Sequence, residues 1–158
     1  MGNIFSASEV VELGIQIEKN GRDFYNTLAK QFKATTASQV FEFLAIEEEK
    51  HVKVFQGILD KVEKYEPQGL DADEYSAYMR SLAAEHIFTQ KNKGEEIART
   101  IKTKEDAIQR GIGFEEDSIV FYEGMKKIVP DYDQKVIDEL IRQEQHHLKQ
   151  LIDLKSRT

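Results

Sequence analysis

Apolar residues recur at steps of three and four along four long stretches of the chain, a spacing typical of amphipathic helices. These stretches cover residues 7–32, 37–64, 104–128 and 132–155. Ser6 with Glu9, and Thr36 with Gln39, have the spacing of capping boxes at the starts of the first two stretches. The pattern therefore predicts an all-α protein with four long helices.

The connections between these expected helices differ in length. Only a few residues join the first helix to the second and the third to the fourth, so each pair is expected to form an antiparallel hairpin. Residues 65–103 separate the two hairpins, and we expect one short helix around residues 74–84. Because long structureless loops are uncommon in compact domains, we interpret this segment as a crossover along the bundle. The sequence thus predicts one domain over residues 1–158.

Composition narrows the class of protein. The 158 residues are 40% hydrophobic and 32% charged, which is typical of a soluble globular protein. No apolar run approaches transmembrane length and no signal peptide is recognisable, so we expect a cytoplasmic protein with no membrane partner. The net charge of −7 argues against a nucleic-acid partner. The absence of cysteine excludes disulfides, thiolate metal sites and cysteine catalysis within these residues.

Two stretches of the chain repeat one order of acidic, aromatic and imidazole residues. Each contains a lone glutamate, then Phe-Tyr, then Glu-x-x-His. The first copy is Glu18, Phe24, Tyr25, Glu48 and His51, and the second is Glu115, Phe121, Tyr122, Glu144 and His147. The lone glutamate precedes the Glu-x-x-His by 30 residues in one copy and by 29 in the other. The repeat indicates that both hairpins contribute to one site.

The acidic and imidazole residues of the repeat all fall on the inward stripe of their helices, where the neighbouring positions are apolar or small. Burying isolated carboxylates is costly unless they are paired, protonated or bound to metal. Four carboxylates and two neutral imidazoles carry a charge of −4, which two divalent cations balance. A single Glu-x-x-His on an acidic helix would predict little, but two matched copies predict a two-metal site. We expect two iron ions, with zinc or manganese as alternatives.

Five further residues stand near this expected site. Tyr25 and Tyr122 share the face of the lone glutamates, either as core tyrosines or as donors to a ligand carboxylate, and we assign them as candidate catalytic residues outside the ligand set. Gly21 and Ser118 lie one turn beyond the lone glutamates, where they either permit close helix packing or leave a cavity beside the metals. His86, in the crossover, is expected to be a surface or packing residue and not a ligand.

These motifs resemble those of the rubrerythrin-like branch of the ferritin-like di-iron carboxylate proteins, across all four long helices. The resemblance rests on Ile-x-x-Glu with Phe-Tyr, on Glu-x-x-His and on Asp-Ser-Ile-x-Phe-Tyr. It implies a ferritin-like four-helix bundle with Glu48 and Glu144 as the pair of ligands that bridges the two irons. The full iron ligand set that it implies is Glu18, Glu48, His51, Glu115, Glu144 and His147.

The chain departs from that family pattern in two respects. Rubrerythrins proper carry a rubredoxin-like iron site built on cysteines, and the chain contains no cysteine. Many of them also have a second glutamate one turn after the ligand of the third long helix, where Ser118 stands here. An electron donor inside the chain and a mobile second ligand are therefore both missing from the expected site.

The sequence and the resemblance together predict a non-haem di-iron oxidoreductase of the peroxidase or ferroxidase type. Its substrate would be peroxide or dioxygen, and its electrons would come from an external donor. Two alternatives stay open: an iron-binding ferroxidase in iron handling, and a non-catalytic structural or sensory protein that binds metal. We expect a homodimer, the commonest state of soluble homo-oligomers.

Overall fold

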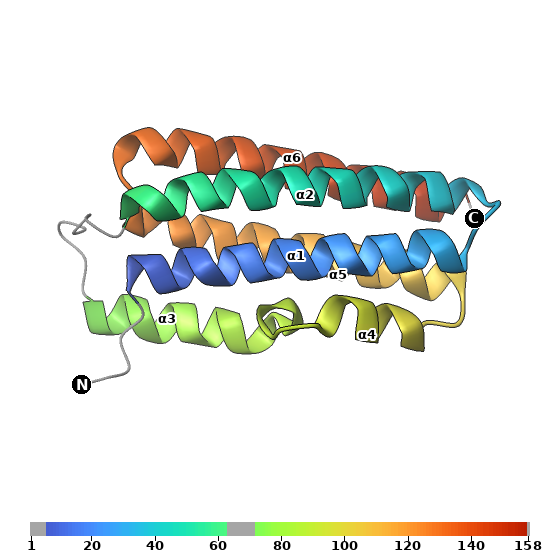
Figure 1. Cartoon of the computed structure of the whole chain (residues 1–158), viewed down its shortest axis with the longest axis horizontal. Helices are drawn as coiled ribbons and strands as arrows, with labels where there is room; N and C mark the ends of the chain where they lie inside the picture. Colours follow the sequence, from blue (N-terminus) through green and yellow to red (C-terminus); the bar gives the residue numbers. More distant parts are fainter. Residues whose placement is uncertain (1–5, 63–71, 158) are drawn as a thin grey trace.

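The computed structural model describes residues 6–62 and 72–157 of the chain (Figure 1). The elements, in order, are α1 (Ala7–Gln31), α2 (Thr36–Val62), α3 (Ala72–Glu85), η1 (Ile87–Thr89), α4 (Lys93–Thr100), α5 (Lys104–Met125), η2 (Lys126–Ile128) and α6 (Asp131–Ser156). No strand occurs among the described residues, so the expected all-α class is confirmed. None of the helices in these two ranges is both long enough and apolar enough to cross a membrane.

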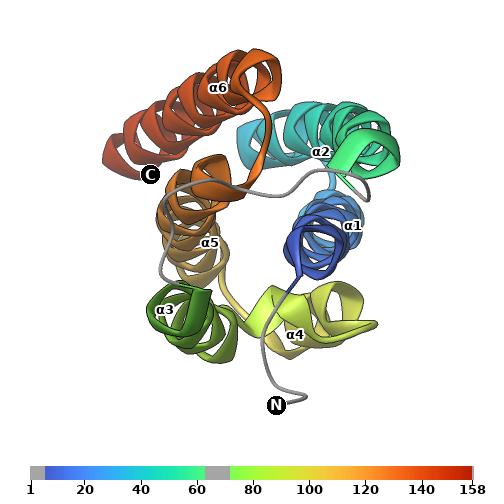
Figure 2. The same cartoon turned by 90° about the vertical axis from the view of Figure 1, so that its left-hand side faces the viewer.

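The four long helices form a bundle of two hairpins. α1 packs along α2, and α5 packs along α6, as both views show (Figures 1 and 2). Contacts between α1 and α5, and between α2 and α6, close the bundle around one core. Fully buried side chains from all four helices fill it, among them Phe24, Leu28, Phe41, Phe55, Ile108, Phe121, Ile137 and Leu151. The predicted four-helix bundle is therefore present.

The starts of the first two helices test the predicted caps. Ser6 caps α1 as expected, because its Oγ accepts a hydrogen bond from the backbone N–H of Glu9 at 3.2 Å. The predicted cap at Thr36 is wrong by one residue. Thr35 Oγ1 accepts the backbone N–H of Ser38 at 3.2 Å, and Thr36 is already the first residue of α2. Residues 35 and 36 are both threonines, so the spacing of a capping box did not show which of them caps the helix.

The limits of the long helices agree with the periodicity to within a few residues. The helix expected over residues 104–128 is divided in the structure, since α5 gives way to the 3₁₀ turn η2 over its last three residues. The helix expected over residues 132–155 corresponds to α6. The predicted end of the second helix at residue 64 lies outside the described residues, which stop at Val62.

The crossover contains more structure than predicted. The one short helix expected around residues 74–84 corresponds to α3, but η1 and a second helix, α4, follow it. In the end-on view α3 and α4 lie against α5 and α1, on the side of the bundle away from α2 and α6 (Figure 2). The prediction of a crossover with a single short helix is therefore wrong, because α4 has only eight residues and depends on contacts that local periodicity does not reveal.

Asn20 of α1 holds the crossover in place. Its Nδ2 donates to the carbonyl oxygens of Phe88 and Gln90 at 2.7 and 2.5 Å, and its Oδ1 accepts the backbone N–H groups of Lys93 and Gly94, both at 3.1 Å. The last two bonds satisfy unpaired donors at the start of α4. A Cβ on Gly94 would lie 1.9 Å from the backbone oxygen of Asn20, so only glycine allows this approach.

Candidate metal centre

The six predicted ligands meet at the middle level of the bundle. Each long helix supplies at least one of them: Glu18 from α1, Glu48 and His51 from α2, Glu115 from α5, Glu144 and His147 from α6. All four glutamates are 0% exposed and both histidines are 1% exposed. The helical period explains this placement, because Glu and His three residues apart project from the same inward face.

Ligand atoms of these residues form two groups that share two members. Glu18, Glu48, His51 and Glu144 make one group, and Glu48, Glu115, Glu144 and His147 make the other. Within each group the candidate ligand atoms lie within 4.8 Å of one another. Glu48 and Glu144 belong to both groups, which is the position expected for a bridging pair.

Both imidazoles turn Nδ1 towards the carboxylates. His51 Nδ1 lies 2.8 Å from Glu144 Oε1 and 3.5 Å from Glu18 Oε2. His147 Nδ1 lies 3.7–3.9 Å from one oxygen each of Glu48, Glu115 and Glu144. The two rings stack with their centroids 5.7 Å apart. The inward nitrogen of each ring is therefore the one available to a metal.

Buried polar atoms without a hydrogen-bond partner are concentrated at this point. They include Glu18 Oε2, Glu48 Oε1 and Oε2, His51 Nδ1, Glu115 Oε2, Glu144 Oε1 and Oε2, and His147 Nδ1. Buried polar groups are nearly always satisfied in folded proteins, so this concentration of oxygen and nitrogen atoms points to bound cations, whether protons or metal ions. Oxygen and imidazole donors in this number suit two divalent ions, iron among them. The residues present therefore fit a pair of metal ions.

Protons occupy the centre when metal does not. Burial, together with the charge of Glu144, raises the pKa of Glu48 and of Glu115 well above the usual value of a glutamate. Burial by itself would lower the pKa of His51, but Glu18 and Glu144 beside it raise this pKa to about 11. Metal binding at these residues would consequently release protons.

The two candidate catalytic tyrosines are donors to ligand carboxylates, and each reaches across to the other hairpin. Tyr25 of α1 donates its hydroxyl hydrogen to Glu115 Oε1 at 2.8 Å, and Tyr122 of α5 donates to Glu18 Oε1 at 2.5 Å. Burial and the charge of the facing glutamate raise the pKa of both phenols well above the ordinary value. Each tyrosine thus keeps its proton and occupies one oxygen of a lone glutamate.

The residues one turn beyond the lone glutamates differ from each other. At Gly21 a Cβ would lie 2.5 Å from Phe114 Cζ and 3.1 Å from Glu48 Oε2, so glycine permits close packing there. Ser118 instead lies within hydrogen-bond distance of His86, with Nε2 and Oγ 3.1 Å apart. His86 is buried, so of the two expected locations, surface or interior, the structure shows the interior one.

Sequence reasoning missed Gln143, a direct neighbour of the centre. Its Oε1 lies 2.7 Å from His51 Nε2, on the side of the ring away from the carboxylates. The two side chains help to line a groove of about 640 Å³ between α2 and α6. Only the position of Gln143 just before Glu144 could have suggested this contact, and a glutamine on a polar helix carries no distinctive signal.

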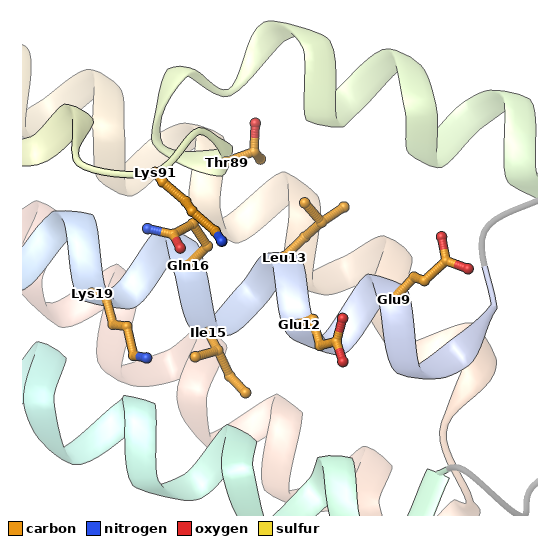
Figure 3. A pocket seen from close by; sticks show the side chains of 8 residues that line it. All are labelled: Glu9, Glu12, Leu13, Ile15, Gln16, Lys19, Thr89 and Lys91. Atoms are coloured by element: carbon orange, nitrogen blue, oxygen red, sulfur yellow. The ribbon is translucent and has the colours of Figure 1, made fainter.

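A second hollow in the surface lies away from the centre. It runs along α1 beside η1 and has a volume of about 410 Å³ (Figure 3). Charged and polar side chains form most of its lining, including Glu9, Glu12, Lys19, Thr89 and Lys91. None of the six predicted ligands lines it, so it adds nothing to the chemistry of the metal centre.

Comparisons with known proteins agree with this geometry. Residues 9–155 match the sequence profile of the Rubrerythrin family. A crystal structure from Thermotoga maritima, described as that of a ferritin-like diiron-carboxylate protein, superposes with a TM-score of 0.70 at 24% sequence identity. The match covers 99% of this chain and 98% of that one, and it shows the same fold. No curated protein matches the chain significantly. With the profile covering nearly all of its length, the chain belongs to the rubrerythrin family.

Proposed function

We propose that the protein is a non-haem di-iron carboxylate oxidoreductase that reduces peroxide or dioxygen with electrons from an external donor. The observation that carries this proposal is the pair of candidate ligand groups that share Glu48 and Glu144. Together they contain eight buried oxygen and nitrogen atoms without a hydrogen-bond partner. Membership of the rubrerythrin family and the ferritin-like diiron fold support iron as the metal.

Each ligand has a distinct task in this proposal. Glu48 and Glu144 would bind both ions, while Glu18 with His51, and Glu115 with His147, would each complete one ion's set. When bound, two ferrous ions supply one electron each, so that a two-electron oxidant is reduced without release of a radical. The four carboxylates balance the charge of the pair and make its burial tolerable.

The tyrosines orient the lone glutamates. Tyr122 occupies Oε1 of Glu18, and Tyr25 occupies Oε1 of Glu115, while Oε2 of each glutamate has no partner. Each lone glutamate would therefore offer a single oxygen to its metal. A ligand held through one oxygen leaves more of the coordination sphere open to an oxidant than a ligand held through two.

The source of electrons is proposed to be another molecule. The 158 residues contain no cysteine and hence no thiolate-bound iron that could pass electrons to the centre. The groove between α2 and α6 supports an external donor, because the candidate ligand His51 and its partner Gln143 line it. A donor seated in this groove would be one imidazole ring away from the proposed metal pair.

Rapid mixing of the ferrous protein with each oxidant tests the proposal. The protein is loaded anaerobically with two ferrous ions per chain and mixed with hydrogen peroxide or with dioxygen in a stopped-flow spectrometer. We expect oxidation at least about tenfold faster than that of the same iron in buffer. His147→Ala should abolish the acceleration, whereas His146→Ala, at the exposed neighbouring position, should retain it. Unaccelerated oxidation with both oxidants would refute the proposal.

The same experiment separates the iron-handling alternative. A redox enzyme retains two ferric ions per chain after the reaction and returns to the ferrous state on reduction. A ferroxidase that handles iron instead releases its ferric product or oxidises iron beyond two equivalents. Iron analysis of the protein after desalting distinguishes these outcomes.

A further inference from the structure

A small pocket reaches from the surface into the bundle on the crossover side. It has a volume of about 240 Å³ and lies where α1, α5 and the segment around η1 meet. Its inner wall consists of buried side chains, namely Phe24, His86, Phe88 and Phe114. The exposed side chains of Arg110 and Asp117 stand at its outer part. The pocket is therefore aromatic inside, polar outside and too small for a drug-sized ligand.

The ring of Phe114 borders both this pocket and the metal centre. Phe114 lines the pocket, and its Cζ lies 2.5 Å from the point that a Cβ of Gly21 would occupy. Glu48 Oε2 lies 3.1 Å from that same point. The Phe114 ring also contacts the ring of Tyr25, whose hydroxyl donates to Glu115. The ring of Phe114 is therefore the place where a path from the pocket to the candidate ligands would have to open.

One residue of the buried wall, His86, is hydrogen-bonded to a completely buried serine, Ser118, that does not itself line the pocket. The backbone N–H of Phe88 donates to His86 Nδ1 at 3.3 Å, so the ring hydrogen is on Nε2 and is donated to Ser118 Oγ at 3.1 Å. Ser118 therefore accepts from His86 and keeps its own hydroxyl hydrogen. Among the residues that the structure describes, Ser118 Oγ forms no second hydrogen bond. A completely buried hydroxyl one turn from Glu115 is thus left with a donor to offer.

We propose that this pocket is the route by which hydrogen peroxide reaches the centre, and that Ser118, fixed by His86, donates a hydrogen bond to it there. The inference rests on the proposed function and concerns the path by which its oxidant enters. Aromatic walls favour a small uncharged molecule over an anion. A buried donor next to the pocket wall, one turn from Glu115, favours peroxide over dioxygen, because peroxide forms hydrogen bonds and dioxygen hardly does.

Gly113 offers a way to close the pocket. It lines the pocket, and a Cβ at this position would meet no atom within 4 Å. Gly113→Leu should fill the space without overpacking the core, and leucine is a better helix former than glycine. Gly57, on α2, is equally open and provides the matched control, Gly57→Leu.

Xenon binding measures the pocket without any metal. Xenon enters apolar cavities, so crystals of the metal-free protein under xenon pressure should show a site beside Phe114. The same site should be present in Gly57→Leu and absent from Gly113→Leu. A Gly113→Leu protein that still binds xenon there has an open pocket and would be replaced by the bulkier Gly113→Phe.

Access to the loaded centre is then measured with two probes. Nitric oxide binding to the ferrous protein reports access without turnover, and stopped-flow oxidation reports peroxide. We expect Gly113→Leu to slow both by at least about tenfold and Gly57→Leu to slow neither. Unchanged rates in a variant that excludes xenon would overturn the route while leaving the proposed function intact. A parent that binds nitric oxide but reacts with no oxidant would refute the proposed function, and the nitric oxide rates would still decide the route.

The role of Ser118 has its own test. Ser118→Ala removes the donor and keeps the space, so it should slow the reaction with peroxide several-fold and leave nitric oxide binding unchanged. Ser118→Thr, which restores a hydroxyl, should recover the peroxide rate. Equal effects of Ser118→Ala on peroxide and on nitric oxide would remove the hydrogen bond from the proposal.

Discussion

The hairpin α1–α2 and the hairpin α5–α6 carry the same candidate ligands in different surroundings. An offset of 97 residues aligns Glu18 and Tyr25 with Glu115 and Tyr122, and both pairs occupy equivalent, completely buried positions. The histidines differ. His51 has Gln143 at Nε2 and a carboxylate oxygen 2.8 Å from Nδ1. His147 forms no hydrogen bond at Nε2 within the described residues, and its ring lies nearly perpendicular to that of Phe43, with the two centroids 6.2 Å apart.

The same offset pairs residues that have diverged in role. Gly21 corresponds to Ser118, and Asn20 corresponds to Asp117. On α1, Gly21 admits Phe114 and Asn20 binds the crossover backbone. On α5, Ser118 pairs with the buried His86 of the crossover, and Asp117 stands at the outer part of a pocket.

Two different requirements act on the residues of the hairpins: those of the site and those of the crossover. In the proposed function, two metal ions in equivalent positions would take the same kinds of ligand from each hairpin, which would account for the repeat of the acids and imidazoles. The crossover is a single segment and meets the two hairpins through different residues. The asymmetry of the centre is thus imposed from outside the ligand set, by the crossover on one side and Gln143 on the other.

The largest expected effect concerns the shared ligands. Glu48→Ala and Glu144→Ala should each weaken the binding of both metals, whereas Glu18→Ala and Glu115→Ala should weaken one. Removal of a residue that only hydrogen-bonds to a ligand lowers metal affinity roughly 10- to 100-fold. Removal of a direct ligand should lower it further. Metal content after dialysis checks this, with His146→Ala as the control. Equal occupancy across the four variants would contradict the shared position of Glu48 and Glu144.

Metal removal should reverse the pH dependence of stability. In the metal-free protein the pKa of His51 is about 11, above its unfolded value of about 6.5. Its contribution to stability is complete below the unfolded pKa and is lost as pH rises towards the folded one. The raised pKa values of Glu48 and Glu115 act in the same direction. The free energy of unfolding should therefore increase from about pH 8.5 to about pH 7, by up to about 1.4 kcal/mol per pH unit for each proton.

The metal-loaded protein should show the opposite slope, because protons compete with metal for the same atoms. Thermal or denaturant unfolding of both forms across this range measures the two slopes. The window ends at about pH 7 because burial lowers the pKa of His86 and of His147, which opposes the trend under more acidic conditions. Parallel slopes for the two forms would show that the ligands do not form one cluster.

The crossed tyrosines should contribute equally. Tyr25→Phe and Tyr122→Phe each leave a buried carboxylate oxygen without its donor, which costs about 1–3 kcal/mol of unfolding free energy. Phe41→Leu provides a control for packing, because Phe41 stacks on Tyr25 but has no hydroxyl that could donate to a carboxylate. An unaffected Tyr122→Phe protein beside a destabilised Tyr25→Phe protein would break the equivalence of the hairpins.

The smallest effect should distinguish the two histidines. Gln143→Leu removes the acceptor of His51 Nε2 and should reduce the affinity of one metal by about tenfold, with the other metal unaffected. Gln143→Glu keeps an acceptor and should preserve both affinities. Stepwise metal titration resolves the two events, and a uniform weakening of both would show that Gln143 does not act through His51.

Periodicity and charge along the sequence predicted the long helices and the six residues that meet at the middle of the bundle. Apolar steps of three and four define α1, α2, α5 and α6, and the inward positions of Glu18 and Glu115 result from the same steps. The structure brings the six predicted ligands together. Their clustering was predictable, because a carboxylate on the buried face of a helix is costly unless other groups or a metal ion compensate its charge.

Features that depend on contacts between distant segments were not predictable. The eight residues of α4 are too few to form a helix alone and are held by Asn20, 73 residues before Lys93. The tyrosines could be assigned to a ligand carboxylate, but not to the glutamate of the opposite hairpin. No acidic residue stands three or four positions from His86 in a way that would suggest a site, and only the fold of the crossover brings His86 to Ser118.

Anomalous X-ray diffraction at the iron edge tests the two-metal centre most directly. Crystals of the protein loaded anaerobically with ferrous iron should show two anomalous peaks per chain, about 3.5–4 Å apart. One peak should lie beside His51 and Glu18, the other beside His147 and Glu115, with Glu48 and Glu144 between them. A single peak, or iron bound away from these six residues, would contradict a carboxylate-bridged pair.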